Sequence, residues 1–158
     1  MRLLITLFAA AAVMFAQQPA AKTFTSAADV AAMIAKAKND RKADQANFVQ
    51  ALLQSAPYTV NLEYRVKGVA APAAVHEAEV EIFYVVEGTG TLTTGGKLHD
   101  EKRTNPTNLS GTAIEGGASR HVAKGDFFVV PQNTPHGFTD IGNALVLMSV
   151  HVPAGGAK

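Results

Sequence analysis

The chain has 158 residues, is 47% hydrophobic and 17% charged, and carries a formal net charge of +1. This length fits one domain with a buried core, and the balanced charge argues against binding to nucleic acid or to an acidic membrane. Cysteine is absent, which excludes disulfides, thiol catalysis and iron–sulfur clusters and leaves His, Asp and Glu as the side chains for any metal chemistry.

The first sixteen residues differ from the rest of the chain. Arg2 supplies one positive charge, and residues 3–16 are almost wholly apolar. A charged start followed by a short apolar stretch is typical of a secretory signal, and the stretch is too short to span a bilayer comfortably. We therefore expect residues 1–16 to be a cleaved signal peptide and the mature protein to be secreted or periplasmic, free of the membrane. An uncleaved N-terminal anchor is the alternative.

Residues 17–56 are predicted to form a helical N-terminal extension. Ser26 followed by Asp29 resembles a capping box, and apolar residues then recur at helical spacing. A second helical pattern covers residues 43–54 and is ended by Pro57. We expect two short helices that cover one end of the domain.

From Tyr58 onward the hydrophobic period changes to two, which indicates β-strands. Gly- and Pro-rich segments separate the strands, and residues 97–120 are predicted to be a long polar loop with one short strand near residues 112–114. The pattern predicts an all-β sandwich or barrel. The expected strands are residues 58–66, 82–86, 89–94, 127–130 and 144–152. The positions expected to be mostly buried are Leu62, Tyr64, Phe83, Val85, Phe128, Val130 and Val146.

Two histidines lie at informative positions. His76 precedes an apolar strand and is followed by a carboxylate at Glu81, and His136 follows a tight turn at the end of another apolar strand. A barrel would bring both turns to its mouth, where two neutral imidazoles and a carboxylate suit Fe(II), Mn(II), Zn(II) or Ni(II). A purely structural role for polar residues at turns is the alternative.

Residues 68–88 resemble the first motif of the cupin superfamily, written G(X)5HXH(X)3–4E(X)6G. Gly68, His76, Glu81 and Gly88 fit every spacing of that motif. The second motif, G(X)5PXG(X)2H(X)3N, follows in the expected order. It is matched through Gly125, Pro131 and His136, with Asn133 and Asp140 where the motif has Gly and Asn.

The resemblance implies a metal site with fewer ligands than is usual. The family's ligands carry over onto His76, Glu81 and His136, but Ala74 stands where the motif has its first His. A two-His, one-carboxylate site still binds a divalent metal and leaves more positions open to water or substrate. Another nearby group is an alternative fourth ligand: Glu77, Glu79 or His121. His151, on the last strand, is interpreted either as a core residue or as a group that points into the barrel and supports the ligands without binding the metal.

The resemblance also implies the fold and a broad function. We expect a small single-domain cupin, that is, an antiparallel β-barrel or jelly roll over residues 57–152, with residues 153–158 as a tail. It would be an exported protein that binds a divalent metal (Fe, Mn, Zn or Ni) and a small molecule in the barrel, with a metal-dependent enzyme activity left open. The alternative is a metal-free module that binds a small molecule or a carbohydrate. By analogy with the family we expect a homodimer.

Overall fold

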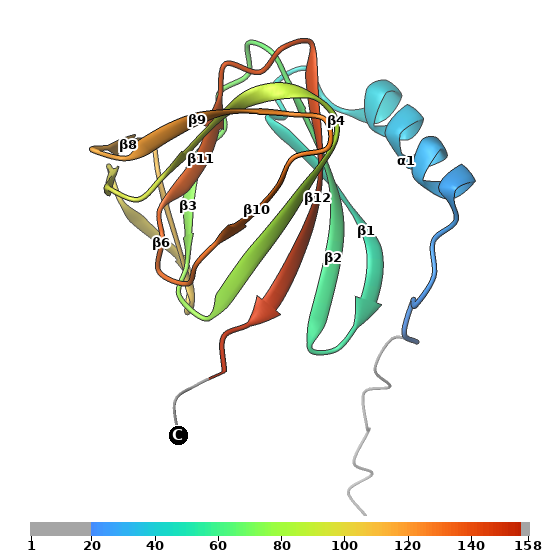
Figure 1. The fold of residues 1–158 in the computed structure, drawn as a ribbon, viewed down its shortest axis with the longest axis horizontal. Helices are drawn as coiled ribbons and strands as arrows, with labels where there is room; N and C mark the ends of the chain where they lie inside the picture. Colours follow the sequence, from blue (N-terminus) through green and yellow to red (C-terminus); the bar gives the residue numbers. More distant parts are fainter. Residues whose placement is uncertain (1–19, 156–158) are drawn as a thin grey trace, which may run out of the picture.

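The computed structural model describes residues 20–155 (Figure 1). The expected signal peptide, residues 1–16, lies outside the described residues. Across the described part, no helix is long and apolar enough to cross a membrane. One helix and twelve strands follow one another in this part of the chain: α1 (Ala27–Asp40), β1 (Asn47–Ser55), β2 (Tyr58–Val66), β3 (Ala73–His76), β4 (Glu79–Thr94), β5 (Lys97–His99), β6 (Lys102–Asn105), β7 (Asn108–Gly111), β8 (Ala113–Glu115), β9 (Ala118–Ala123), β10 (Phe127–Val130), β11 (His136–Thr139) and β12 (Ala144–Pro153).

Most strands form one curled antiparallel sheet with the order β1-β2-β12-β4-β11-β3-β7-β6, and β9 and β10 also pair with β4. The long strand β4 belongs to both halves of the sheet: its first half pairs with β12 and β10, and its second half with β11 and β9. The two halves meet near Gly88, whose φ is +86°. The sheet therefore folds around an interior, as the alternating pattern predicts (Figure 1).

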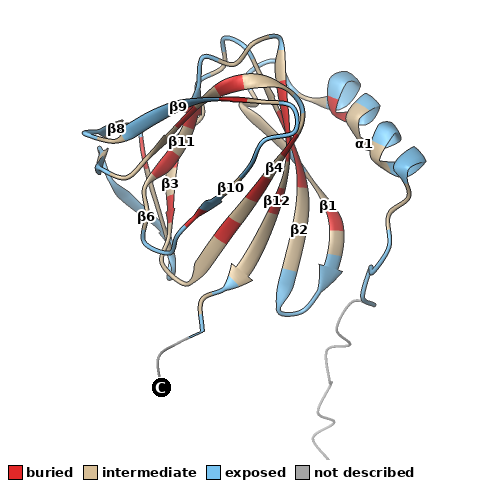
Figure 2. Ribbon diagram, viewed as in Figure 1, coloured by how far each residue is buried: buried red, intermediate tan, exposed pale blue. Residues whose placement is uncertain are grey.

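Two apolar layers lie on opposite faces of this sheet. The interior core is formed by side chains that point into the barrel: Phe83, Val85, Leu92, Val122, Val130, Phe138, Leu145 and Leu147. The outer layer is where α1 packs on β1, β2 and β12, and it buries Ala37, Leu52, Leu62, Tyr64 and Val146. Figure 2 shows the buried positions along the middle of β4, β12 and β2.

Six of the seven positions expected to be mostly buried are buried, and the seventh, Phe128, is partly buried against the interior core. The side chains at these seven positions point to two different sides of the sheet. Leu62, Tyr64 and Val146 face α1 outside the barrel, and the others face its interior. Both faces of β2 are therefore covered along its middle.

The first predicted helix is confirmed and the second is wrong. The Ser26 side chain accepts a hydrogen bond from the backbone N–H of Asp29 and begins α1, as the capping box predicts. Residues 47–55 instead form β1, which pairs antiparallel with β2. A register shift between Ala51 and Leu53 interrupts the pairing, and both Leu52 and Leu53 pack in the outer layer. This bulge explains why the apolar spacing of a strand imitates that of a helix.

The prediction of a long loop over residues 97–120 is also wrong, although the one short strand expected near residues 112–114 is present as β8. This stretch forms four complete short strands, β5 to β8, and the beginning of β9. All four residues of β6 are exposed, and most of β9 is as well. Strands with polar side chains on both faces carry no alternation of apolar and polar residues, so the sequence pattern does not mark them.

Candidate functional site

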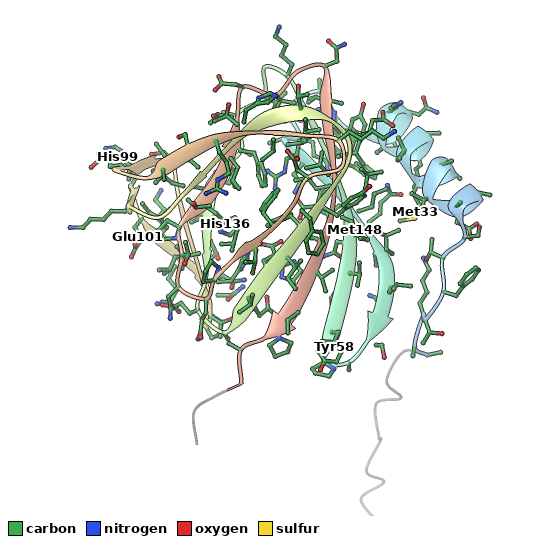
Figure 3. All side chains as sticks on the ribbon, in the orientation of Figure 1. Met33, Tyr58, His99, Glu101, His136 and Met148 are labelled. Carbon is green, nitrogen blue, oxygen red and sulfur yellow. The ribbon has the colours of Figure 1, made fainter. Side chains whose placement is uncertain are left out.

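Four strands deliver one titratable side chain each to a common point inside the barrel. His76 ends β3, Glu81 lies near the start of β4, His136 begins β11, and His151 lies near the end of β12. His151 is the direct cross-strand partner of Glu81. In Figure 3, His136 lies inside the curled sheet, whereas His99 lies at its rim.

The carboxylate of Glu81 is the centre of this cluster. One oxygen, Oε2, lies 3.2 Å from Nε2 of His76 and 3.1 Å from Nε2 of His136. The other oxygen, Oε1, lies 3.2 Å from Nε2 of His151. The Glu81 side chain is only 4% exposed and that of His136 is 7% exposed. The fold thus brings together the three residues that the motifs predict and adds His151.

In each imidazole, Nδ1 is the nitrogen that does not face Glu81, and it lies next to an oxygen acceptor. Nδ1 of His76 lies 3.0 Å from Oδ1 of Asn108, its neighbour across the sheet on β7. Nδ1 of His136 lies 3.2 Å from the carbonyl oxygen of Thr134. Such partners place the hydrogen of a neutral imidazole on Nδ1 and leave a lone pair on Nε2.

His151 follows the same pattern with a charged acceptor. Its Nδ1 lies 2.9 Å from Oε2 of Glu79, and its Nε2 faces Glu81. All three rings therefore turn an Nε2 atom toward one carboxylate. The atoms that His76, Glu81 and His151 offer lie within 4.8 Å of one another, a spacing that allows them to hold a metal ion. His136 is not a member of this group, although its Nε2 contacts the same carboxylate.

This arrangement needs a positive charge between the groups. Neutral rings with Nδ1–H would present three lone pairs to an anionic carboxylate, which is a repulsive contact. Oε2 of Glu81 is buried and has no hydrogen bond of good geometry. Protons on the imidazoles or a bound cation would each resolve the contact, and the donor set of imidazole and carboxylate fits a divalent transition metal.

The ionisation of the two central groups reflects the same contacts. Burial on its own would raise the pKa of Glu81, but the close approach of His136 and His76 to its carboxylate outweighs burial, so the pKa lies below its ordinary range. The contact with Glu81 raises the pKa of His76 against the opposing effect of burial. The carboxylate is therefore held in its charged form.

The three residues that the sequence analysis names as alternative fourth ligands do not lie at the centre of the cluster. Glu79 contacts His151 rather than the centre of the cluster. Glu77 forms an ion pair with Arg103 on the barrel surface, 2.6 Å from Oε2 to Nη1. His121 is exposed on β9. Neither Glu77 nor His121 joins the cluster.

Sequence reasoning left His151 outside the ligand set, although a signal for it exists. On β12, Leu145 and Leu147 point into the interior core, and the period of two continues through Ser149 to His151. A histidine at the end of an inward-facing row points toward the same interior as the motif histidines. The motif spacing alone does not reveal this, because His151 lies beyond both motifs.

An aromatic group adjoins the cluster on its inner side. The rings of Phe83 and Phe128 are stacked with centroids 5.1 Å apart, and Phe83 lies 6.1 Å from the ring of His136. Phe138 packs edge-on to Phe83 at 5.4 Å. The site therefore has an apolar wall, which lowers the local polarity and strengthens electrostatic contacts there.

The chain belongs to the cupin family, whose sequence profile matches residues 27–157. No curated protein matches the sequence significantly. Solved structures share the fold. A double-stranded β-helix protein from Klebsiella pneumoniae has a TM-score of 0.54 at 16% identity and covers 74% of this chain and 85% of its own.

Two further similar structures have names that state a metal or an activity. The Fe(II) form of HppE has a TM-score of 0.53 at 17% identity, over 68% of this chain and 52% of HppE. The DMSP lyase DddQ from Ruegeria pomeroyi has a TM-score of 0.55 at 16% identity, over 89% of this chain and 70% of the lyase. At these identities the likeness is one of fold.

Proposed function

We propose that this protein is an exported cupin that binds a divalent metal through His76, Glu81 and His136 and a small oxygen-bearing molecule beside it. One observation carries the proposal: the buried carboxylate of Glu81 faces Nε2 atoms whose rings are already committed to acceptors through Nδ1. A divalent cation at this point satisfies the lone pairs of the rings and the charge of the carboxylate together.

The partners of the rings support a metal over a purely structural cluster. Residues that hold Nδ1 of a ligating histidine fix both its tautomer and its orientation, and Asn108 and Thr134 do so here. The set of imidazole nitrogens and carboxylate oxygen suits Fe(II), Mn(II), Zn(II) or Ni(II) and does not by itself select one. Similar folds are known in Fe(II) and Co(II) forms of HppE.

A metal held by few protein ligands leaves positions for a small molecule. The cation would supply Lewis acidity toward an oxygen donor of that molecule. Of this chain's own groups, the Phe83 and Phe128 rings offer an apolar wall for its carbon atoms. Whether a reaction follows depends on a positioned base, and Glu79, which contacts His151, is the nearest further carboxylate.

The rival function is a metal-free module that binds a small molecule or a carbohydrate in the same interior. In that case protonated imidazoles supply the positive charge. The observation that favours it is the contact of Nε2 of His76 with Oε2 of Glu81 at 3.2 Å, which raises the pKa of His76. Elemental analysis of the purified protein, prepared with and without a chelator, separates the two. We expect one equivalent of a transition metal that the chelator removes, and a metal content no higher than in a His76→Ala/His136→Ala variant would contradict the proposal.

Export rests on the pattern of residues 1–16. We expect the mature protein outside the cytoplasm of its native host, with an N-terminus near Gln17 or Ala21. Fractionation followed by N-terminal sequencing tests this expectation. Mature protein that retains Met1 would contradict cleavage.

A further inference from the structure

The place left by the missing motif histidine lies next to the cluster. Ala74 is two residues before His76 on β3, so both side chains share one face of the strand. Ala74 is also the cross-strand partner of His136. The methyl group of Ala74 cannot bind a metal. At this position of β3 the chain therefore lacks the imidazole that the cupin motif has.

His151 supplies an imidazole from a different strand. Its Nε2 lies 3.2 Å from Oε1 of Glu81, the oxygen that the other two histidines do not contact. The rings of His151 and His76 are 5.4 Å apart and nearly perpendicular. Its donor atom falls within the same 4.8 Å group as those of His76 and Glu81.

We infer that His151 is a ligand of the metal proposed above, so that the last strand replaces the donor that Ala74 removes. The inference rests on the proposed metal site and deepens it: the protein supplies four donors rather than three. They are the close group of His76, Glu81 and His151 and, beside Oε2 of Glu81, His136. A fourth protein donor leaves fewer coordination positions for a small molecule.

Glu79 is the positioning residue of this ligand. Its Oε2 accepts the hydrogen of Nδ1 of His151 at 2.9 Å. A carboxylate in this place fixes the tautomer with a free Nε2, turns the ring toward Glu81 and makes the imidazole a more basic donor. Glu79 lies two residues before Glu81 on β4, so both carboxylates point into the interior.

The competing explanation is an ion-paired core histidine. In that case His151 is a protonated imidazolium that bridges Glu79 and Glu81, and it contributes stability but no metal ligand. The two explanations differ in what happens to metal affinity, and they differ again in whether a histidine placed at position 74 compensates for the loss of His151.

The experiment titrates the purified protein with Co(II) and measures both the affinity and the visible absorption spectrum, which reports the donors around the ion. We expect His151→Ala to weaken Co(II) binding by roughly tenfold or more and to change the spectrum. His99→Ala, which removes an exposed histidine at the rim, is the matched control and should leave both unchanged.

A second substitution makes the test independent of simple loss of structure. Ala74→His should restore Co(II) binding in the His151→Ala background. In the wild type it should improve the affinity by no more than about twofold, because the fourth donor is already present.

The role of Glu79 has its own pair of variants. Glu79→Ala should weaken Co(II) binding by roughly tenfold, and Glu79→Gln should retain most of the affinity, because the amide oxygen still accepts from Nδ1 of His151.

The outcomes distinguish the inference from the function on which it rests. Absence of Co(II) binding by the wild type would overturn both. Wild-type binding that is unchanged in His151→Ala, or an Ala74→His variant that tightens the wild type as much as the His151→Ala background, would overturn the inference and leave the three-ligand site standing.

Discussion

His151 and Glu81 are direct partners across β12 and β4, with Nε2 of the histidine 3.2 Å from Oε1 of the carboxylate. The register of these two strands therefore decides whether the last strand reaches the centre of the site. A shift by one residue would turn His151 to the outer face. The continuous pairing from Leu147 to Pro153 holds it in place.

Replacing Glu81 by glutamine tests the origin of this geometry. The side-chain amide can donate to an Nε2 lone pair, so at a pH above the raised pKa of His76, where that ring is neutral, the metal-free Glu81→Gln protein should be as stable as the wild type or more so. Its metal-dependent rise in melting temperature should disappear, because the anionic donor is gone. Melting curves in chelator and in excess Zn(II) measure both effects, with Glu115→Gln, on the exposed β8 strand, as control. A retained metal response would contradict a ligand role for Glu81.

Metal affinity should rise with pH. Protons compete with the metal for Nε2, and the contact with Glu81 raises the pKa of His76, so this competition extends to higher pH than for an ordinary histidine. The metal-free protein has the opposite dependence: stability from protonated His76 is present at low pH and is lost as the pH rises through the raised pKa. Competition titrations between about pH 6 and 8 should show increasing affinity, and a flat profile would contradict proton competition.

The interior core predicts unequal losses for two stacked phenylalanines. Phe83 is 1% exposed, and Phe83→Ala should lower the free energy of unfolding by about 3–5 kcal/mol through the cavity it leaves. Phe128 is only partly buried against the same core, so Phe128→Ala should cost less, about 1.5–3 kcal/mol. Urea unfolding monitored by circular dichroism measures the difference. Equal losses would mean that the burial of the two rings is not as described.

Gly88 is required where β4 passes between the two halves of the sheet. A Cβ at this position would lie 1.9 Å from the carbonyl oxygen of Ala144. Gly88→Ala should therefore cost more than Gly95→Ala, because Gly95 has a similar φ of +78° but open space around it. The control variant, Gly95→Ala, should be destabilised only by the strain of a positive φ, about 1–2 kcal/mol. Equal stability of the two variants in urea unfolding would place the chain crossing elsewhere.

The strands that cover a core on one face could be predicted from the sequence. Alternation predicts β2 with the bounds that the structure has, because one face of this strand packs on apolar neighbours. The short apolar run that ends at Pro131 predicts β10 with its bounds. The stretch of residues 97–120 could not be predicted in this way. All four residues of β6 are exposed, and β5 and β8 have three residues each with one half-buried position, so their patterns are too weak or too short to mark strands.

Part of the candidate site could be predicted from the sequence and part could not. Motif spacing predicts that His76, Glu81 and His136 meet, and the fold places both histidines against the carboxylate of Glu81. His151 arrives through the register of β12 on β4, which is a long-range property of the folded sheet. The strand β1 is a similar case, because pairing with β2 and a bulge near Leu52 override a local spacing that favours a helix.

The most direct test of a metal centre is the melting temperature of the purified protein with and without a divalent metal, for the wild type and His136→Ala. A metal that binds only the folded state should stabilise the wild type by about 2.7 kcal/mol at a hundredfold excess over Kd. The His136→Ala variant should lose most of this stabilisation, because one ligand from the second motif is gone, and His99→Ala should keep it. If Zn, Mn, Ni and Fe(II) all leave the wild-type melting temperature unchanged, the protein is a metal-free cupin and the account of a metal centre is contradicted.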